Sequence, residues 1–153
     1  MADKAQRRIL ITGSAGFIGF HLASRMLQSG AAVLGVDNFT AYYDPKLKER
    51  RNQLLAQHEG FSLARISIDD ADALAAAWRE FEPDIVVHLA AQAGVRYSIH
   101  HPADYIATNI GRTLNIPALA RPHPVPPLLA PPTRSAPSSP TPPPPSPTPP
   151  PHP

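Results

Sequence analysis

Apolar residues in the first 91 positions form four short runs, and segments with apolar side chains at helical spacing separate these runs. The runs occupy residues 8–12, 32–36, 61–68 and 85–91. The separating segments occupy residues 17–28, 46–58 and 70–81. Short runs rich in β-branched residues predict strands, and strands that alternate with helices predict a parallel sheet. We therefore expect an α/β fold with a doubly wound parallel sheet of about four strands.

The run at residues 85–91 is the most apolar, and it predicts a central strand that is buried on both faces. The loop that follows lies at the carboxyl end of that strand, where open α/β sheets bind ligands. Arg96 in this loop is a candidate partner for a substrate phosphate or carboxylate, because a guanidinium can form two parallel hydrogen bonds. An ordinary surface arginine is the alternative. Residues 103–116 have partial helical periodicity and predict a further helix.

Three glycines separate the first predicted strand from the first predicted helix. Gly13 suits a turn that needs a positive φ, Gly16 would let a pyrophosphate approach the backbone, and Gly19 would let the helix pack closely on the strand. The N–H groups at the helix start, together with the helix dipole, attract an anion. A glycine-rich turn without a ligand is the alternative interpretation.

Asp37 supplies the context that the glycine pattern needs, since it follows the second predicted strand, 18 residues after Gly19. In dinucleotide-binding folds an acidic residue at this place accepts hydrogen bonds from the ribose hydroxyls of NAD. Its charge would repel a 2′-phosphate. The pattern therefore predicts an incomplete Rossmann-type fold that binds NAD in preference to NADP.

Proline is distributed unevenly, because 18 of the 21 prolines in this 153-residue chain lie in residues 117–153. Proline lacks a backbone N–H group and blocks helix interiors and central strands. We therefore expect three parts. These are an NAD-binding domain over residues 1–116, a degraded helix and strand region over 117–130, and a disordered or polyproline tail over 131–153.

Charge and cysteine content argue against several classes of protein. The net charge is only +2 and the basic residues are scattered, so nucleic-acid binding is not indicated. The chain has no cysteine, and its first apolar run is too short for a signal peptide or a membrane span. These features favour a cytoplasmic protein that does not bind membranes. No metal site is predicted, and His21 is expected to pack at the edge of the core.

Several spaced motifs, in order, resemble the extended short-chain dehydrogenase/reductase superfamily and, within it, the UDP-glucuronate 4-epimerase branch of the nucleotide-sugar epimerases. The resemblance covers residues 7–116. Its motifs are the three glycines, Asp37-Asn38, Tyr42-Tyr43-Asp44, Leu47-Lys48 and the run from His88 to Ser98. It implies an enzyme that keeps NAD bound, oxidises C4 of a nucleotide sugar to a ketone and returns the hydride to the other face.

The resemblance also implies which residues hold NAD at its pyrophosphate, its adenosine and its nicotinamide side. In chain order they are Gly13, Gly16, Phe17, Ile18, Gly19, Asp37, Asn38, Ser67, Ile68, Leu89, Ala90, Ala91 and Asn109. Ser67 stands where the family usually has an aspartate near the adenine, although Asp69 is close. The family also implies a nucleotide-sugar substrate and a homodimer, but the missing C-terminal region argues against a homodimer for this chain.

The chain has no counterpart of the family's catalytic Tyr-x-x-x-Lys, since its last tyrosine is Tyr105 and its last lysine is Lys48. Without a tyrosine base the rate falls ~10²–10⁴-fold. We therefore assign no catalytic residue, and we hypothesise the N-terminal part of an epimerase, truncated or frame-disrupted and inactive alone. An NAD-binding module with a proline-rich interaction arm is the alternative.

Tyr42 and Lys46 have the Tyr-x-x-x-Lys spacing, and a small complete dehydrogenase that uses them is a third hypothesis. Pro45 lies between the two residues and disfavours helical backbone at the residue before it. The pair also follows the second predicted strand rather than a later one. We interpret this match as coincidental.

Overall fold

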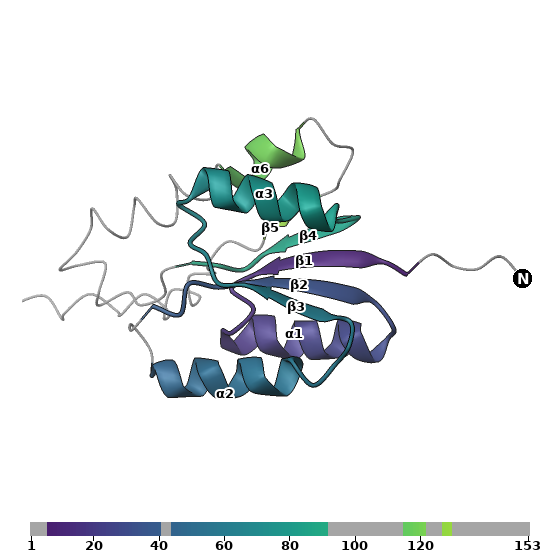
Figure 1. Cartoon of the computed structure of the whole chain (residues 1–153), viewed down its shortest axis with the longest axis vertical. Helices are drawn as coiled ribbons and strands as arrows, with labels where there is room; N and C mark the ends of the chain where they lie inside the picture. Colours follow the sequence, from purple (N-terminus) through teal and green to yellow (C-terminus); the bar gives the residue numbers. More distant parts are fainter. Residues whose placement is uncertain (1–5, 41–43, 92–114, 122–126, 130–153) are drawn as a thin grey trace, which may run out of the picture.

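The computed structural model describes residues 6–40, 44–91, 115–121 and 127–129 (Figure 1). Within these residues, five parallel strands form one sheet in the order β3-β2-β1-β4-β5. They are β1 (Arg8–Thr12), β2 (Ala32–Val36), β3 (Phe61–Ala64), β4 (Ile85–His88) and β5 (Pro127–Leu129). The first strand of the sequence is therefore the middle strand of the sheet, with connections running to both sides. The predicted doubly wound parallel fold is confirmed.

Helices cover both faces of this sheet (Figure 1). α1 (Phe17–Gln28) and α2 (Pro45–Leu55) lie on one face. α3 (Ala71–Phe81) and α6 (Asn115–Ala120) lie on the other. Each face of the central strands is thus shielded from water, which explains why their sequences are almost continuously apolar.

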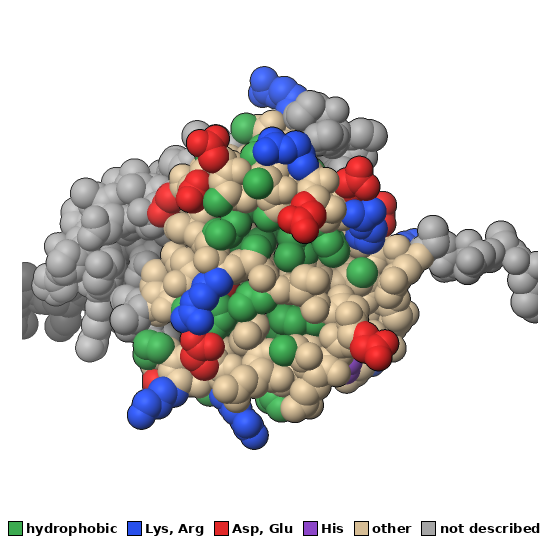
Figure 2. Space-filling view, in the orientation of Figure 1, with side chains coloured by type: hydrophobic (Ala, Val, Ile, Leu, Met, Phe, Trp, Pro, Cys, Tyr) green, Lys and Arg blue, Asp and Glu red, His purple; other side chains and the backbone are tan. Residues whose placement is uncertain are grey.

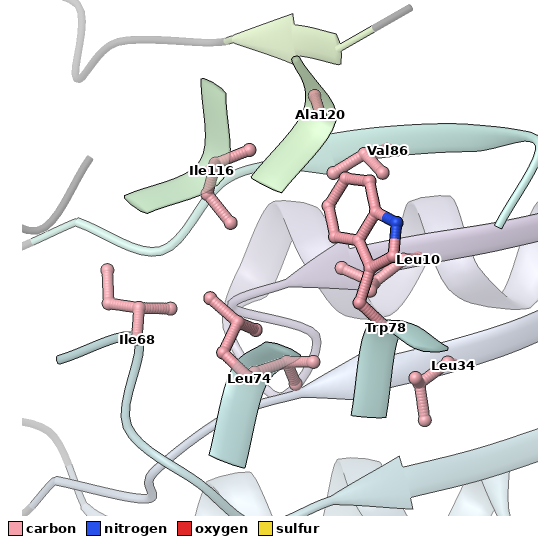
Figure 3. Packing of buried hydrophobic residues seen from close by; sticks show 9 residues of the cluster. Leu10, Leu34, Ile68, Leu74, Trp78, Val86, Ile116 and Ala120 are labelled. Carbon is pink, nitrogen blue, oxygen red and sulfur yellow. The ribbon is translucent and has the colours of Figure 1, made fainter. Parts of the chain in front are cut away.

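Two hydrophobic cores result, one on each side of the sheet. β1 serves both cores, because successive side chains of a strand point to opposite faces. Ile11 packs on the α1 side and Leu10 on the α3 side. On the α3 side, Trp78 lies beside Leu10, and Ile116 of α6 completes the same buried cluster (Figure 3).

Capping side chains fix the starts of α2 and α3 where the sequence predicts them. The Asp44 carboxylate accepts a hydrogen bond of 2.9 Å from the Lys46 N–H, and Pro45 occupies the first helical position. Asp70 caps α3 in the same way. α2 ends at Leu55, three residues earlier than predicted, because the chain turns there toward β3.

Two strands are shorter than predicted. β3 ends at Ala64 rather than at residue 68, because its neighbour β2 ends in the same register and the ladder has no further partner. β4 ends at His88 rather than at residue 91. The next N–H group, that of Leu89, donates to both the carbonyl and the side-chain oxygen of Thr12, and the N–H group of Ala90 donates to the side-chain oxygen alone, so regular pairing with β1 ends here.

The buried face of α1 differs from the predicted apolar stripe. It consists of Gly19, Ala23 and Leu27. Gly19 and Ala23 are small and let the helix lie close to the sheet. Phe17 is exposed, and so is His21, whose ring contacts Phe17 edge to face. The prediction that His21 packs at the edge of the core is therefore wrong.

The sheet extends past the last residues that the sequence predicted to fold. α6 continues to Ala120 and contains Pro117 in its first turn, where a missing N–H group costs no helical hydrogen bond. β5 adds a fifth strand where four were predicted. The predicted helix over 103–116 lies almost wholly outside the described residues.

Candidate functional site

A cavity lies at the carboxyl ends of β1, β2, β3 and β4. Each strand contributes the residues that follow its last ladder position, so a parallel sheet brings four separate segments of sequence to one place. The lining residues are Gly13, Gly16, Val36, Asp37, Asn38, Thr40, Lys48, Ile66, Ser67, Ile68, Leu89, Ala90 and Ala91.

The glycine turn after β1 forms one wall, and its glycines are sterically required. Gly13 has a φ of +72°, and its N–H group donates to the Val36 carbonyl at 2.7 Å. A Cβ atom on Gly13 would lie 2.9 Å from the Ala90 nitrogen. A Cβ atom on Gly19 would lie only 2.1 Å from the Gly13 oxygen. The turn and the first turn of α1 are therefore packed backbone against backbone.

The amino end of α1 is open to an anion. Gly16 is the N-cap residue, and within the described part of the chain no side chain caps this helix and no acidic residue lies in its first turn. Its first N–H groups and its dipole therefore favour a negatively charged group. Phe17 and Ile18 are 66% and 67% exposed and do not line the cavity.

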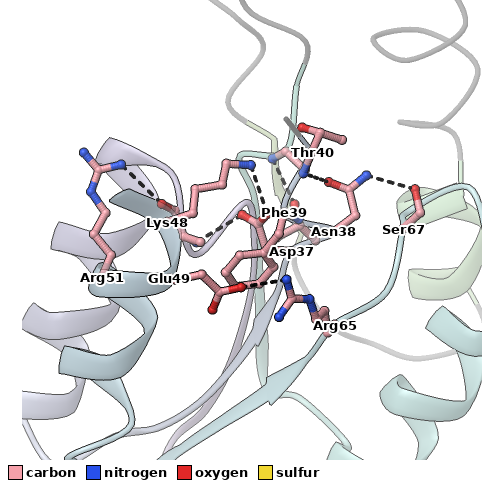
Figure 4. A network of polar contacts seen from close by, with 12 residues as sticks. Asp37, Asn38, Phe39, Thr40, Lys48, Glu49, Arg51, Arg65 and Ser67 are labelled. Carbon is pink, nitrogen blue, oxygen red and sulfur yellow. Dashed lines mark hydrogen bonds and ion pairs between the residues drawn. The ribbon is translucent and has the colours of Figure 1, made fainter. Parts of the chain in front are cut away.

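Asp37 lies directly after β2 and next to the glycine turn, with its side chain only 4% exposed (Figure 4). Its Oδ2 atom accepts from the Ala15 N–H at 3.1 Å. Its Oδ1 atom accepts from the Phe39 N–H at 2.9 Å and from Lys48 Nζ at 3.1 Å. Phe39 itself has left-handed backbone, with φ of +52°, so the chain turns directly after this contact. The carboxylate thus links the glycine turn, the β2 loop and α2.

Two charged side chains of α2 turn toward this site. The Lys48 side chain is 12% exposed, because α2 lies beside the loop that follows β2. Arg51 donates to the Ala15 carbonyl at 3.3 Å. Leu47 and Leu54 on the same helix are 49% and 39% exposed.

A polar chain links the loops after β2 and β3. Asn38 Nδ2 donates to Ser67 Oγ at 3.3 Å, and Ser67 Oγ donates to Asp69 Oδ2 at 2.9 Å. Ile68 beside them is buried. Ser67, which replaces an expected carboxylate, is therefore connected to a carboxylate two residues further along.

Thr12 and His88, at the ends of β1 and β4, form a buried pair beneath the cavity floor. Thr12 Oγ1 accepts from the N–H groups of Leu89 and Ala90 at 3.2 and 3.1 Å, and lies 2.7 Å from His88 Nδ1. Which of the two groups donates in this contact depends on the tautomer of the imidazole. Burial lowers the pKa of His88 below its usual value, because it disfavours the charged form of the ring.

The structure gathers most of the residues that the sequence singled out, and it adds others. Phe17, Ile18 and Gly19 lie at or behind the turn rather than in the lining. Arg96, Asn109 and Tyr42 lie outside the described residues. The additional lining residues are Val36, Thr40, Lys48 and Ile66. No local pattern could have identified Lys48 as a site residue, because its position depends on how α2 packs.

Acidic and basic side chains are interspersed over the face of the molecule seen in Figure 2. None of the helices in the described part of the chain combines the length and the apolar character needed to cross a bilayer. The cavity therefore provides the clearest indication of function among the described residues.

Comparison with known proteins identifies this arrangement. The family described as "NAD dependent epimerase/dehydratase family" matches residues 9–152. The "Probable UDP-glucuronate 4-epimerase" of Rhizobium meliloti (strain 1021) is 46% identical over 114 residues, which are 74% of this chain and 33% of that protein. "Protein CapI" of Staphylococcus aureus is 45% identical over 109 residues, 71% of this chain and 32% of that protein.

Solved structures agree with the sequence relatives. The UDP-glucuronic acid 4-epimerase of Bacillus cereus, in complex with UDP-glucuronic acid and NAD, superposes with a TM-score of 0.68 at 34% identity. The superposition covers 74% of this chain and 36% of that one. The UDP-glucose 4-epimerase of Thermus thermophilus, in complex with NAD, gives a TM-score of 0.64 at 32% identity and covers 77% and 35%.

The chain thus spans about a third of the length of the relatives that it matches. The matching family model nevertheless covers nearly all of the chain, and the glycine turn, the carboxylate after β2 and the cavity between them lie where a dinucleotide-binding sheet requires them. The chain belongs to the NAD dependent epimerase/dehydratase family.

Proposed function

We propose that this chain binds NAD in the cavity and serves as the cofactor-binding part of a nucleotide-sugar 4-epimerase that acts on UDP-glucuronate or a close analogue. The observation that carries the proposal is the pairing of two features across one cavity. The open amino end of α1 suits a pyrophosphate, and the buried Asp37 carboxylate suits ribose hydroxyls.

The residues of the cavity fit the cofactor sterically as well as electrostatically. Side chains at Gly13 and Gly19 would collide with backbone atoms, so the turn keeps its compact form with the helix amino end exposed. Ile66 and Ile68 provide an apolar wall on the β3 side, which suits the flat face of an adenine. NAD would supply hydride transfer, and the chain's own residues would bind and orient it.

The UDP-glucuronate assignment rests on the relatives, whose names specify that substrate. The catalytic tyrosine and lysine that the resemblance implies have no counterpart in this sequence. We therefore infer that the chain binds the cofactor and does not by itself interconvert UDP-glucuronate and its C4 epimer. An assay with NAD and UDP-glucuronate should show no turnover above background, and measurable turnover would contradict this inference.

Calorimetric titration of the whole chain with NAD tests the central proposal. We expect saturable binding at one site. Gly16→Val should weaken binding at least about tenfold, because its side chain would occupy the approach to the helix amino end. Gly30→Asn is the matched control, since Gly30 ends α1 away from the cavity and asparagine tolerates its φ of +85°. A folded wild-type chain that ignores millimolar NAD would refute the proposal.

The second hypothesis, an NAD-binding module with a proline-rich interaction arm, shares the same cofactor site. It differs in giving residues 131–153 a binding role, and those residues lie outside the described part of the chain. Its distinguishing prediction is that removing 131–153 abolishes capture of a partner protein while leaving the affinity for NAD unchanged.

A further inference from the structure

The Asp37 carboxylate has too few free acceptor positions for the task that the proposed function gives it. A carboxylate has about four lone-pair positions. Three donors already occupy it, namely the N–H groups of Ala15 and Phe39 and the ammonium of Lys48. The two hydroxyls of a ribose need two positions. One of the three present donors must therefore give way or be shared when a ribose binds.

Lys48 is the donor that can move. The other two donors are backbone groups, fixed by the glycine turn after β1 and by the loop after β2. Lys48 reaches the carboxylate on a flexible four-carbon chain from α2, and its side chain lines the cavity (Figure 4). Its ammonium has three N–H donors, and the contact with Asp37 uses one of them. It can therefore donate to a ribose oxygen whose own hydroxyl donates to Asp37.

We propose that Lys48 is a second ligand of the adenosine ribose and that it sets how strongly the site discriminates between NAD and NADP. This inference rests on the proposed function, because it requires the cofactor to bind with its adenosine ribose at Asp37. Asp37 alone would present a full negative charge to a 2′-phosphate. Asp37 with Lys48 at 3.1 Å presents a pair with no net charge.

The other cations near Asp37 are already engaged. Arg65 pairs with Glu49 at 2.7 Å and stacks over the Phe39 ring, with its guanidinium carbon 4.2 Å from the ring centroid. Arg51 donates to the Ala15 carbonyl. Among the described residues, Lys48 is therefore the cation placed to interact with a charge at the ribose. Removal of the Lys48 charge should strengthen discrimination against the 2′-phosphate of NADP. Removal of the Asp37 charge should leave Lys48 free to bind that phosphate.

Binding of NAD and of NADP to the whole chain and five variants tests this inference. The readout is the discrimination ratio, defined as the Kd for NADP divided by the Kd for NAD. Lys48→Met leaves one negative charge and should raise the ratio at least about tenfold, whereas Asp37→Asn leaves one positive charge and should lower it at least about tenfold. The double variant Asp37→Asn/Lys48→Met should return within about threefold of the wild-type ratio, and Lys48→Arg should stay near it.

Lys46→Met is the matched control, because it removes the same charge from an exposed position on the same helix. If Lys48 only compensates the buried carboxylate, Lys48→Met lowers stability without moving the ratio more than Lys46→Met does, and the inference is wrong. Should Lys48→Met fail to fold, Lys48→Gln, which removes the charge but keeps a hydrogen-bonding side chain, takes its place and should raise the ratio in the same way. If the wild-type chain binds NAD but the variants have the same discrimination ratio, this inference alone is wrong. If the wild-type chain binds neither cofactor, the proposed function is wrong as well.

Discussion

The Thr12 and His88 pair shows how a single hydroxyl organises the junction of two strands. The Thr12 side-chain oxygen accepts from the N–H groups of Leu89 and Ala90, the two residues that follow β4, and lies 2.7 Å from His88 Nδ1. Leu89 N–H also donates to the Thr12 carbonyl. The Thr12 hydroxyl therefore fixes the course of the chain where β4 leaves the sheet and enters the cavity lining.

The stability of the fold should fall in mild acid because of His88. Its pKa is lowered in the folded state by burial, so between that value and the unfolded value of about 6.5 the unfolded chain binds more protons. The contribution of His88 to the free energy of unfolding is fully present above about pH 6.5. It is lost as the pH falls toward the folded pKa, at up to ~1.4 kcal/mol per pH unit. Urea unfolding at pH 7.5, 6.5 and 5.5 measures it.

Two variants separate His88 from other acid effects. His88→Gln should unfold with a weaker dependence on pH over this range, because glutamine does not titrate. His21→Gln should keep the dependence of the wild-type chain, since His21 is exposed. Equal pH dependence in all three proteins would contradict the assignment.

At the scale of elements, the contact between the glycine turn and α1 is the tightest feature of the fold. Gly19→Ala would place a Cβ atom 2.1 Å from the Gly13 oxygen, and backbone cannot yield as a flexible side chain can. We expect a loss of about 1–3 kcal/mol in the free energy of unfolding, together with loss of NAD binding. Denaturant unfolding and calorimetry check both effects. Unchanged stability would show that the turn can open.

The sequence predicts where most elements begin and predicts less well where they end and what they face. Starts are local events, and Asp44 with Pro45 or Asp70 signals them directly. Ends depend on partners. β4 ends in register with β1, whose last residue, Thr12, is 76 positions away and lies outside any window of local sequence. Lys48 belongs to a motif of the resemblance, but its inward orientation follows only from the packing of α2.

At the scale of the whole molecule, the folded unit extends beyond residue 116, where the sequence predicts that it ends. Asn115 Nδ2 donates to the Ile68 carbonyl at 2.8 Å, and Ile116 is fully buried in the core with Trp78. β5 pairs with β4 over three residues. α6 and β5 therefore belong to the folded unit, despite the prolines within and around them.

A chain shortened to residues 1–114 should consequently be less stable than the whole chain. The point variant Ile116→Ala isolates the contribution of the core and should cost about 2–4 kcal/mol. Ala118→Ser on the exposed side of α6 should cost less than about 0.5 kcal/mol. Chemical unfolding of the whole chain, the shortened chain and the two point variants gives the comparison. A shortened chain as stable as the whole one would restore the boundary at residue 116.

Cofactor binding should raise the stability of the whole molecule, since the cavity is built from the ends of four strands that come together only in the native state. NAD at 100 times its Kd should add about 2.7 kcal/mol to the free energy of unfolding. Thermal melting at increasing NAD concentration measures the gain. NADP at the same concentration should add less.

The central place of β1 also has a consequence for synthesis on the ribosome. The first strand to emerge must wait for its neighbour on one side, because Thr12 and His88 are 76 positions apart. At ~5–20 residues per second, that delay lasts several seconds. During this interval an apolar strand destined for the interior has one edge without a partner, so nascent chains should depend on chaperones until residue 88 has left the exit tunnel.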